Sequence, residues 1–276
     1  MAVDVKIKQK SSFKKKVTIK EIIEIANLSY GVCDEAYRLI PKEIGKRTIL
    51  YDKNKLARGI ELSLENNDII LRLSLPTTPK EIRCFYKIIE TICKIFNTNT
   101  YIRNEETVQI EDNETFIKAD EEGSIYGLKD MKDILATKEY SYLQIFGVYH
   151  PIAIGKKEIK EIDNNLENFE NLLNKLQQLD LYYAAPKLYQ TPDKLIAVYA
   201  IGTKIPSIVP LKPEIISNKS KDIKDWFVFL PGNKTIKYED FINNVDHDNY
   251  YDANHIVICL KEEKIKDLIT KYETKL

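Results

Sequence analysis

The stretch RGIELSLENNDIILRLSLPTTPKEIRCFYKIIETICKIF, residues 58–96, decides the fold of the first half of this chain. Large aliphatic residues alternate with polar residues on both sides of Asn66-Asn67. Asparagine tolerates the positive φ that a type I′ turn needs. The pattern therefore predicts an antiparallel β-hairpin over residues 58–75, with its tip at Asn66-Asn67.

The turn also predicts the register of the hairpin. It places the aliphatic side chains on one face in the cross-strand pairs Leu64–Ile69, Leu62–Leu71 and Ile60–Leu73. On the other face Glu61 lies opposite Arg72, which is a favourable pair of opposite charges. A slip of one residue would scatter both sets, so the register is well specified.

A helix over residues 79–96 follows the hairpin. Thr78 is the expected N-cap, Pro79 takes the first helical position, and Glu81 is placed to close a capping box. The apolar residues after Glu81 recur at helical spacing and predict a buried stripe that packs on the hairpin: Ile82, Phe85, Tyr86, Ile89, Cys93 and Phe96, widened by Ile88, Ile92 and Ile95.

The rest of the first half is predicted from shorter patterns. Residues 3–7 alternate as a strand, and Thr18 with Glu21 forms a capping box for a helix over residues 19–28. The remaining expected elements are strands at 37–40, 48–51, 108–110, 115–117 and 142–148, and a short helix at 124–137.

The second half begins after Gly155, where we expect a domain boundary between residues 1–155 and 156–276. Apolar residues at helical spacing predict one long helix over 156–179. Their spacing also fits nearly three heptads, so a coiled-coil partner is an alternative to packing on its own sheet. A hairpin over 181–201, strands at 226–230 and 255–260 and a terminal helix at 261–272 follow. Hairpins interspersed with helices indicate an α+β fold, possibly of two α+β halves.

Composition limits the classes of function. Lysine plus arginine and aspartate plus glutamate both number 42, so the formal charge is zero and attraction to nucleic acid is not indicated. The lysines near the start are expected to protect an edge strand rather than to bind nucleic acid: Lys6, Lys8, Lys10, Lys14, Lys15, Lys16 and Lys20. No apolar run approaches the length of a membrane span. The four scattered cysteines predict free thiols in a reducing compartment, and hence a cytoplasmic protein.

Sequence motifs for known chemistry are absent. The chain contains no GxGxxG, Walker, CxxC, HExxH or GxSxG motif, so no cofactor is predicted. Cys33 is a poor nucleophile candidate, because its acidic neighbours Asp34 and Glu35 would raise its pKa.

The segment 246–255, DHDNYYDANH, is the strongest chemical candidate. His247, Asp248, Asp252 and His255 are residue types that ligate divalent metals. The alternative is a polar loop in which aspartate and asparagine serve turn formation. A metal site would require the side chain of His255, at the start of an apolar strand, to point outward at the sheet edge. The spacing matches no metal motif, so we expect no bound metal.

Tyrosines cluster in a second candidate segment, YYAAPKLY at residues 182–189. Tyr182, Tyr183, Lys187 and Tyr189 could line a groove for a protein partner, because tyrosine offers a large contact area at low entropic cost. The alternative is a strand and its exit loop, since aromatic residues are ordinary in strands.

Three segments also resemble a known family: residues 27–52, which open with NLSYGV, residues 58–93, and residues 176–189 around DLYYAAP. They are similar to an uncharacterised bacterial family catalogued only as a domain of unknown function, DUF4299. The resemblance implies a bacterial cytoplasmic protein over the full length and carries over no catalytic residue. The absence of a catalytic motif, the few histidines and glycines and the many tyrosines lead us to predict a protein-binding, regulatory or immunity-like module without catalysis. The alternative is an enzyme with a site, possibly metal-assisted, around His247–His255.

Overall fold

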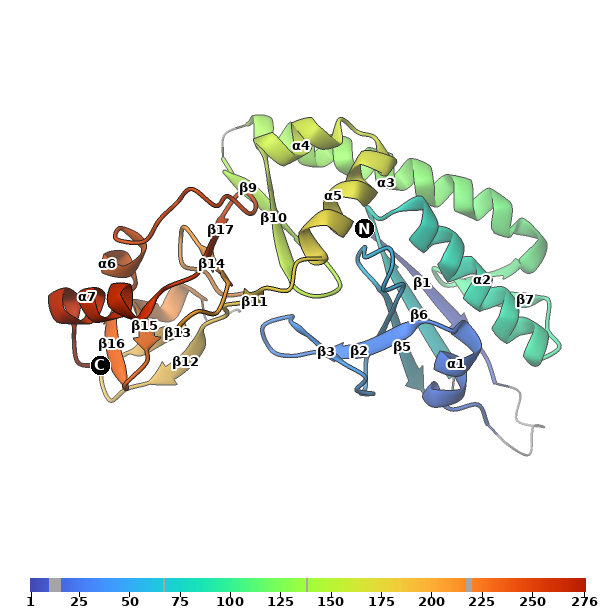
Figure 1. The fold of residues 1–276 in the computed structure, drawn as a ribbon. Coiled ribbons are helices and arrows are strands. Elements are labelled where there is room, and N and C mark those ends of the chain that lie inside the picture. Colours follow the sequence, from blue (N-terminus) through green and yellow to red (C-terminus); the bar gives the residue numbers. More distant parts are fainter. Residues whose placement is uncertain (10–15, 67, 138, 217–219) are drawn as a thin grey trace. The chain divides into compact units, whose positions relative to one another are not determined.

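The computed structural model describes residues 1–9, 16–66, 68–137, 139–216 and 220–276. The chain divides into two compact units, the N-terminal unit Met1–Gln178 and the C-terminal unit Leu179–Leu276 (Figure 1). Both combine helices with sheets that are mostly antiparallel, so the fold is α+β. Within the described ranges, no helix has the length and hydrophobicity needed to span a membrane.

An antiparallel sheet organises the N-terminal unit. In the described residues it has eight strands in the order β3-β2-β4-β5-β6-β1-β7-β8. Their bounds are β1 Ala2–Ile7, β2 Ser29–Cys33, β3 Leu39–Pro41, β4 Thr48–Tyr51, β5 Ile60–Glu65, β6 Asp68–Ser74, β7 Thr100–Arg103 and β8 Glu106–Gln109. A separate pair, β9 Tyr142–Phe146 and β10 Pro151–Gly155, lies later in the unit.

The predicted hairpin is confirmed as β5 and β6, in the predicted register. Leu64 pairs with Ile69, Leu62 with Leu71, Ile60 with Leu73 and Glu61 with Arg72. Asn66 has the expected positive φ of 50°. The second predicted turn residue, Asn67, lies outside the described residues.

One face of this hairpin, which we call the helix face, supplies the core of the unit. Its side chains are almost fully buried against α1 Ile19–Ala26 and α2 Pro79–Ile95: Ile60, Leu62, Ile69, Leu71 and Leu73. The buried stripe of α2 is the one that the sequence predicts, and Ile88 and Ile92 widen it as expected. Ile95, which was also expected to widen it, is 45% exposed. Burial of this aliphatic surface is the main stabilising contribution, roughly 25 cal/mol for each Å² removed from water.

The capping box predicted for α2 forms only in part. Thr78 Oγ1 accepts the backbone N–H of Glu81 at 3.2 Å. The carboxylate of Glu81 does not return to the cap. It accepts instead from the backbone N–H groups of Gly59 at 2.6 Å and Arg58 at 3.2 Å and from the hydroxyl of Thr77. In α1, by contrast, both halves of the Thr18–Glu21 box are present.

The lysines of β1 do not lie on an edge strand. β1 pairs with both β6 and β7, so it is an interior strand of the sheet. Lys6 forms an ion pair with Asp68 at 3.0 Å. The prediction of an edge strand was therefore wrong for β1, and Lys10, Lys14 and Lys15 lie outside the described residues.

A long helix, α3 Asn113–Ala136, replaces the predicted strand at 115–117 and the short helix at 124–137. Tertiary contacts hold it in place. The carboxylate of Asp120 accepts from the Tyr86 hydroxyl at 2.6 Å and from the Arg103 guanidinium at 2.5 Å, and Arg103 also lies 4.6 Å from the ring centroid of Phe116. These partners lie on α2 and β7, so the local pattern could not reveal them.

The long helix predicted over 156–179 is two helices, α4 Lys156–Ile162 and α5 Leu166–Gln177. Asp163 and Asn164 have φ of 47° and 54°, a left-handed conformation that ends α4, and the Asn165 side chain caps α5. Both helices pack on α3. The N-terminal unit consequently extends to Gln178, beyond the boundary we expected after Gly155.

The C-terminal unit contains two smaller sheets. One has the order β11-β14-β17, with bounds Tyr182–Tyr183, Ser207–Pro210 and His255–Ile258. The other has the order β12-β13-β15-β16, with bounds Lys187–Gln190, Leu195–Ala200, Ile223–Leu230 and Lys234–Lys237. The helices α6 Tyr238–Ile242 and α7 Glu262–Tyr272 share a core with these strands.

The hairpin predicted over 181–201 is shorter than expected. β12 and β13 form it, with Lys187 to Gln190 paired to Leu195 to Val198. Tyr182 and Tyr183 belong to the other sheet, where they pair in parallel with β14. Pro186 precedes the hairpin and has no backbone N–H for a ladder.

Candidate binding pocket

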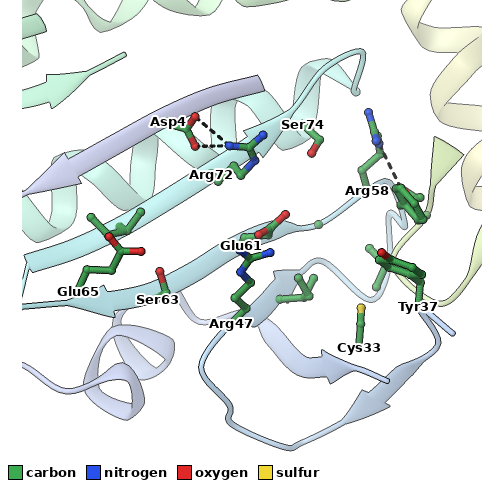
Figure 2. A pocket seen from close by; sticks show the side chains of 16 residues that line it. Asp4, Cys33, Tyr37, Arg47, Arg58, Glu61, Ser63, Glu65, Arg72 and Ser74 are labelled. Atoms are coloured by element: carbon green, nitrogen blue, oxygen red, sulfur yellow. Dashed lines mark hydrogen bonds and ion pairs between the residues drawn. The ribbon is translucent and has the colours of Figure 1, made fainter. Parts of the chain in front are cut away.

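A pocket of about 540 Å³ lies on the N-terminal sheet, on the side opposite to the helix face. Along β5 and β6 its lining residues alternate with the buried aliphatic ones, so we call this side the pocket face. Figure 2 shows the polar side chains that gather there. The lining residues are Asp4, Cys33, Tyr37, Arg47, Ile49, Arg58, Gly59, Glu61, Ser63, Glu65, Ile70, Arg72, Ser74, Phe146, Gly147 and Val148.

Charged side chains are frequent in the lining of the pocket. Arg47, Arg58 and Arg72 are half of the arginines in the whole chain. Three carboxylates, from Asp4, Glu61 and Glu65, balance them. A pocket for a small molecule is usually mostly apolar, with a few polar groups. Here six of the sixteen lining side chains carry a charge, which is typical of a site for a charged partner.

Arg72 is engaged by a neighbour within the sheet. One of its terminal nitrogens donates to both carboxylate oxygens of Asp4, at 2.8 and 2.9 Å. Both side chains are about half exposed, with fractions of 46% and 52%. An exposed ion pair of this kind contributes only about 0.2–1 kcal/mol. The ion pair with Asp4 nevertheless engages the guanidinium of Arg72.

Arg58 is fixed by the backbone around it. Its Nε donates to the carbonyl of Phe146 and its Nη1 to the carbonyl of Pro76, each at 3.1 Å. Burial lowers the pKa of Arg58, and the carboxylates of Glu81 and Glu61 oppose that shift. The two hydrogen bonds of the Arg58 guanidinium thus join the segments around Pro76 and Phe146 at one end of the pocket.

Gly59, the next residue, allows β5 to begin close to β4. Its φ is 84°, and a Cβ built there would lie 2.4 Å from Cγ2 of Ile49. Only glycine meets both requirements without displacing the strand. The N–H of Gly59 then reaches Glu81, which connects the pocket to α2.

Arg47 differs from the other two arginines. Its side chain is exposed, and it makes no hydrogen bond or ion pair with any residue that the structure describes. Figure 2 shows it pointing over β5. A guanidinium with its donors available is the best-suited group in proteins for binding a carboxylate through two hydrogen bonds.

The pocket lacks an activated catalytic group among its described lining residues. Burial, with a further contribution from Asp34 and Glu61, raises the pKa of Cys33 to about 11, so its thiolate is scarce at neutral pH. The lining contains no histidine. At one side, the rings of Tyr37 and Phe146 lie 4.5 Å apart and are 39% and 37% exposed.

The candidate metal residues lie in the C-terminal unit, where Asp252 and His255 contact each other and His247 has a different partner. His247 is exposed and its Nε2 lies 2.7 Å from the carbonyl of Ile242, and Asp248 is also exposed. His255 is 1% exposed, so its side chain does not point outward at the sheet edge as the metal hypothesis required. In the described part of the chain, no three histidine, cysteine or acidic side chains are grouped to hold a metal.

His255 is buried because Asp252 holds it. Asp252 Oδ1 accepts the N–H of Asn254 at 3.0 Å and of His255 at 2.9 Å, and lies 2.7 Å from Nδ1 of the His255 ring. The other ring nitrogen lies 3.5 Å from the Tyr183 hydroxyl and 3.7 Å from Oε1 of Glu214. Tyr183 of the predicted tyrosine set thus contacts His255 of the predicted metal set, and His255 in turn contacts Asp252.

The other candidate tyrosines are on the surface. Tyr182 and Tyr189 are 37% and 50% exposed, and Lys187 is also exposed. Tyr189 and Lys187 lie on β12, in a different sheet from Tyr182. They therefore do not form one continuous strand surface.

Sequence reasoning missed the pocket. The available signal was the arginine count, since all six arginines of the chain precede residue 104. Arg72 entered the prediction only as the cross-strand partner of Glu61. Arg47 and Arg58 lie in loops that only the folded sheet brings near that pair.

The fold and the pocket define an α+β protein with a charged pocket on an antiparallel sheet. A family model described as a domain of unknown function, DUF4299, matches residues 2–268, and the chain belongs to that family. This confirms the resemblance found in the sequence. No curated protein and no solved structure matches the chain.

Proposed function

We propose that this chain is a non-catalytic binding protein of the bacterial cytoplasm, with a regulatory or immunity-like role. Its recognition surface is the pocket face of the N-terminal sheet, and its partner is another protein. The observation that carries the proposal is the exposed guanidinium of Arg47, which no described residue engages, in a pocket without an activated catalytic group.

The lining supports a protein partner over a small apolar molecule. Arginine, tyrosine and phenylalanine are enriched in protein interfaces, and Arg47, Tyr37 and Phe146 all line the pocket. The carboxylates of Glu61 and Glu65 add polar contacts that a hydrocarbon ligand would leave unsatisfied. The four free cysteines fit a reducing compartment.

Photo-crosslinking in the host cell tests the proposal. A photoreactive amino acid replaces Ser63, which lines the pocket, or Lys94, which is exposed on α2. We expect a discrete protein adduct at position 63, lost in Arg47→Glu and retained in Lys46→Glu. Lys46 is exposed and does not line the pocket, so it controls for the change in net charge. An adduct pattern equal at positions 63 and 94, or unaffected by Arg47→Glu, would contradict the proposal.

A second candidate function is acid–base catalysis at His255, in place of a metal-assisted site around His247–His255. The observation that favours it is the buried Asp252–His255 pair, whose second ring nitrogen faces the Tyr183 hydroxyl. A carboxylate that orients an imidazole is a recurring arrangement for a general base. Hydrolysis of a panel of p-nitrophenyl esters by the wild type that is lost in His255→Gln and kept in His247→Ala would support it. Turnover equal in all three proteins would exclude it.

A further inference from the structure

The chemistry of the pocket specifies its partner more closely. Arg72 is bound to Asp4, and Arg58 is bound to two backbone carbonyls. Arg47 alone of the three presents its guanidinium without a hydrogen bond or ion pair to any described residue. The pocket therefore offers one guanidinium, that of Arg47, whose donors no described residue engages. A single carboxylate on the partner would match it.

The remaining carboxylates restrict the number of negative charges that the pocket can accept. Glu61 is half-buried and Glu65 is exposed, and both line the pocket. The charge of Glu61 already affects Arg58 and Cys33. A second acidic group on the partner would meet these like charges at short range. A polyanion such as nucleic acid is disfavoured for the same reason.

The side of the pocket formed by Tyr37 and Phe146 provides an apolar contact. Both rings are more than a third exposed although they contact each other. Ile49 and Val148 line the same pocket. An aromatic pair of this kind suits a large apolar side chain of a partner.

The size of the pocket suits a short segment. Its volume of about 540 Å³ lies within the range of roughly 300–1,000 Å³ that holds drug-sized ligands. A few residues of extended peptide fit that range, whereas a whole helix, about 10–12 Å across with its side chains, needs an open groove.

We infer that the pocket binds an extended peptide segment of a partner protein in which one acidic residue lies close to one large apolar residue. The acidic side chain pairs with Arg47, and the apolar side chain packs on Tyr37 and Phe146. Glu61 and Glu65 exclude runs of acidic residues. This inference rests on the proposed function, because it names the partner of the same pocket.

Selection from a random peptide library displayed on phage, with the full-length chain as bait, tests the inference. Wild type and Lys46→Glu should enrich peptides that carry one aspartate or glutamate within a few residues of a large apolar residue. Arg47→Glu should enrich lysine or arginine at the acidic position instead. Tyr37→Ala should keep the acidic preference and lose the apolar one. Urea unfolding of each variant confirms that it is folded.

Binding of one selected peptide, measured by fluorescence anisotropy, gives the size of the effect. Loss of a charge-assisted pair predicts that Arg47→Glu weakens binding about tenfold or more. A second acidic residue in the peptide should also weaken binding to the wild type.

The outcomes separate this inference from the proposed function. If pocket variants abolish peptide binding but the selected peptides show no acidic preference, the inference fails and the proposed function stands. If the selected peptides bind all pocket variants equally, or no peptide is enriched, the pocket does not recognise peptides and the inference is overturned. The crosslinking at position 63 then decides the proposed function separately, and an adduct that Arg47→Glu does not affect would overturn it as well.

Discussion

The helix face and the pocket face of β5 and β6 are built from alternate residues of the same strands, yet they differ in almost every physical respect. Leu71 is fully buried among aliphatic side chains, whereas its neighbour Arg72 is about half exposed and paired with Asp4. The helix face resembles any well-packed core. The pocket face keeps a concentration of charge that contributes little to folding. The difference indicates that stability resides on one side of the sheet, while the other side carries the proposed recognition surface.

Substitutions of adjacent residues offer the strongest test of this division. Leu71→Ala leaves a cavity in the core and should lower the free energy of unfolding by about 2–5 kcal/mol. Ile70→Ala, on the half-buried pocket face, should cost about 1 kcal/mol or less. Urea unfolding of both variants measures the two losses. Equal losses would show that the two faces do not differ in their contribution to stability.

The C-terminal unit offers the same contrast between its two histidines. His255→Ala leaves the fully buried Asp252 without its ring partner and should cost about 1–3 kcal/mol. His247 is exposed, so His247→Ala should change stability by less than about 0.5 kcal/mol. Urea unfolding again compares the two. A large loss in His247→Ala would mean that the loop around it has a structural role.

The pH dependence of stability tests the connection that Glu81 makes between α2 and the pocket. Burial raises the pKa of Glu81 above its ordinary value of 4.5, although the hydrogen bonds from Thr77, Gly59 and Arg58 oppose the shift. The folded protein therefore holds this proton more tightly than the unfolded chain, and the stabilisation is lost as pH rises through the folded pKa. Relative to Glu81→Gln, the wild type should lose stability from pH 4.5 upward.

Urea unfolding of wild type and Glu81→Gln across that pH range measures the difference. We expect a change smaller than the loss in His255→Ala, because the three donors and Arg58 offset part of the cost of the buried charge. A wild type that gains stability with rising pH would mean that these partners outweigh burial.

The smallest expected effect is on the pocket face itself. A double-mutant cycle with Asp4→Ala and Arg72→Ala should give a coupling energy of about 0.2–1 kcal/mol. In about 1 M salt, where the screening length is roughly 3 Å, the coupling should nearly vanish. Unfolding of the four proteins at low and high salt provides the cycle. A coupling that persists at high salt would show that the pair is shielded from solvent.

Sequence determined what depends on neighbours along the chain. The alternation of residues 60–75, the asparagines at 66–67 and the Thr78-Pro79 start of α2 specified the hairpin, its register and its helix, because these signals act over a few residues. The Thr18–Glu21 capping box was predictable for the same reason. The same reasoning failed for the segment 156–179. Its apolar periodicity continues through Asp163 and Asn164, although the backbone there is left-handed.

Tertiary structure alone decided where polar groups meet. Glu81 leaves its own helix cap for Gly59, 22 residues earlier, and Asp120 joins Tyr86 and Arg103 across α2 and β7. Tyr183 approaches His255 across 72 residues. The pocket likewise combines Arg47, Glu61 and Phe146 from separate segments. The local sequence pattern indicates whether a side chain is buried. Its hydrogen-bonding partner depends on which strands and helices the whole chain brings together.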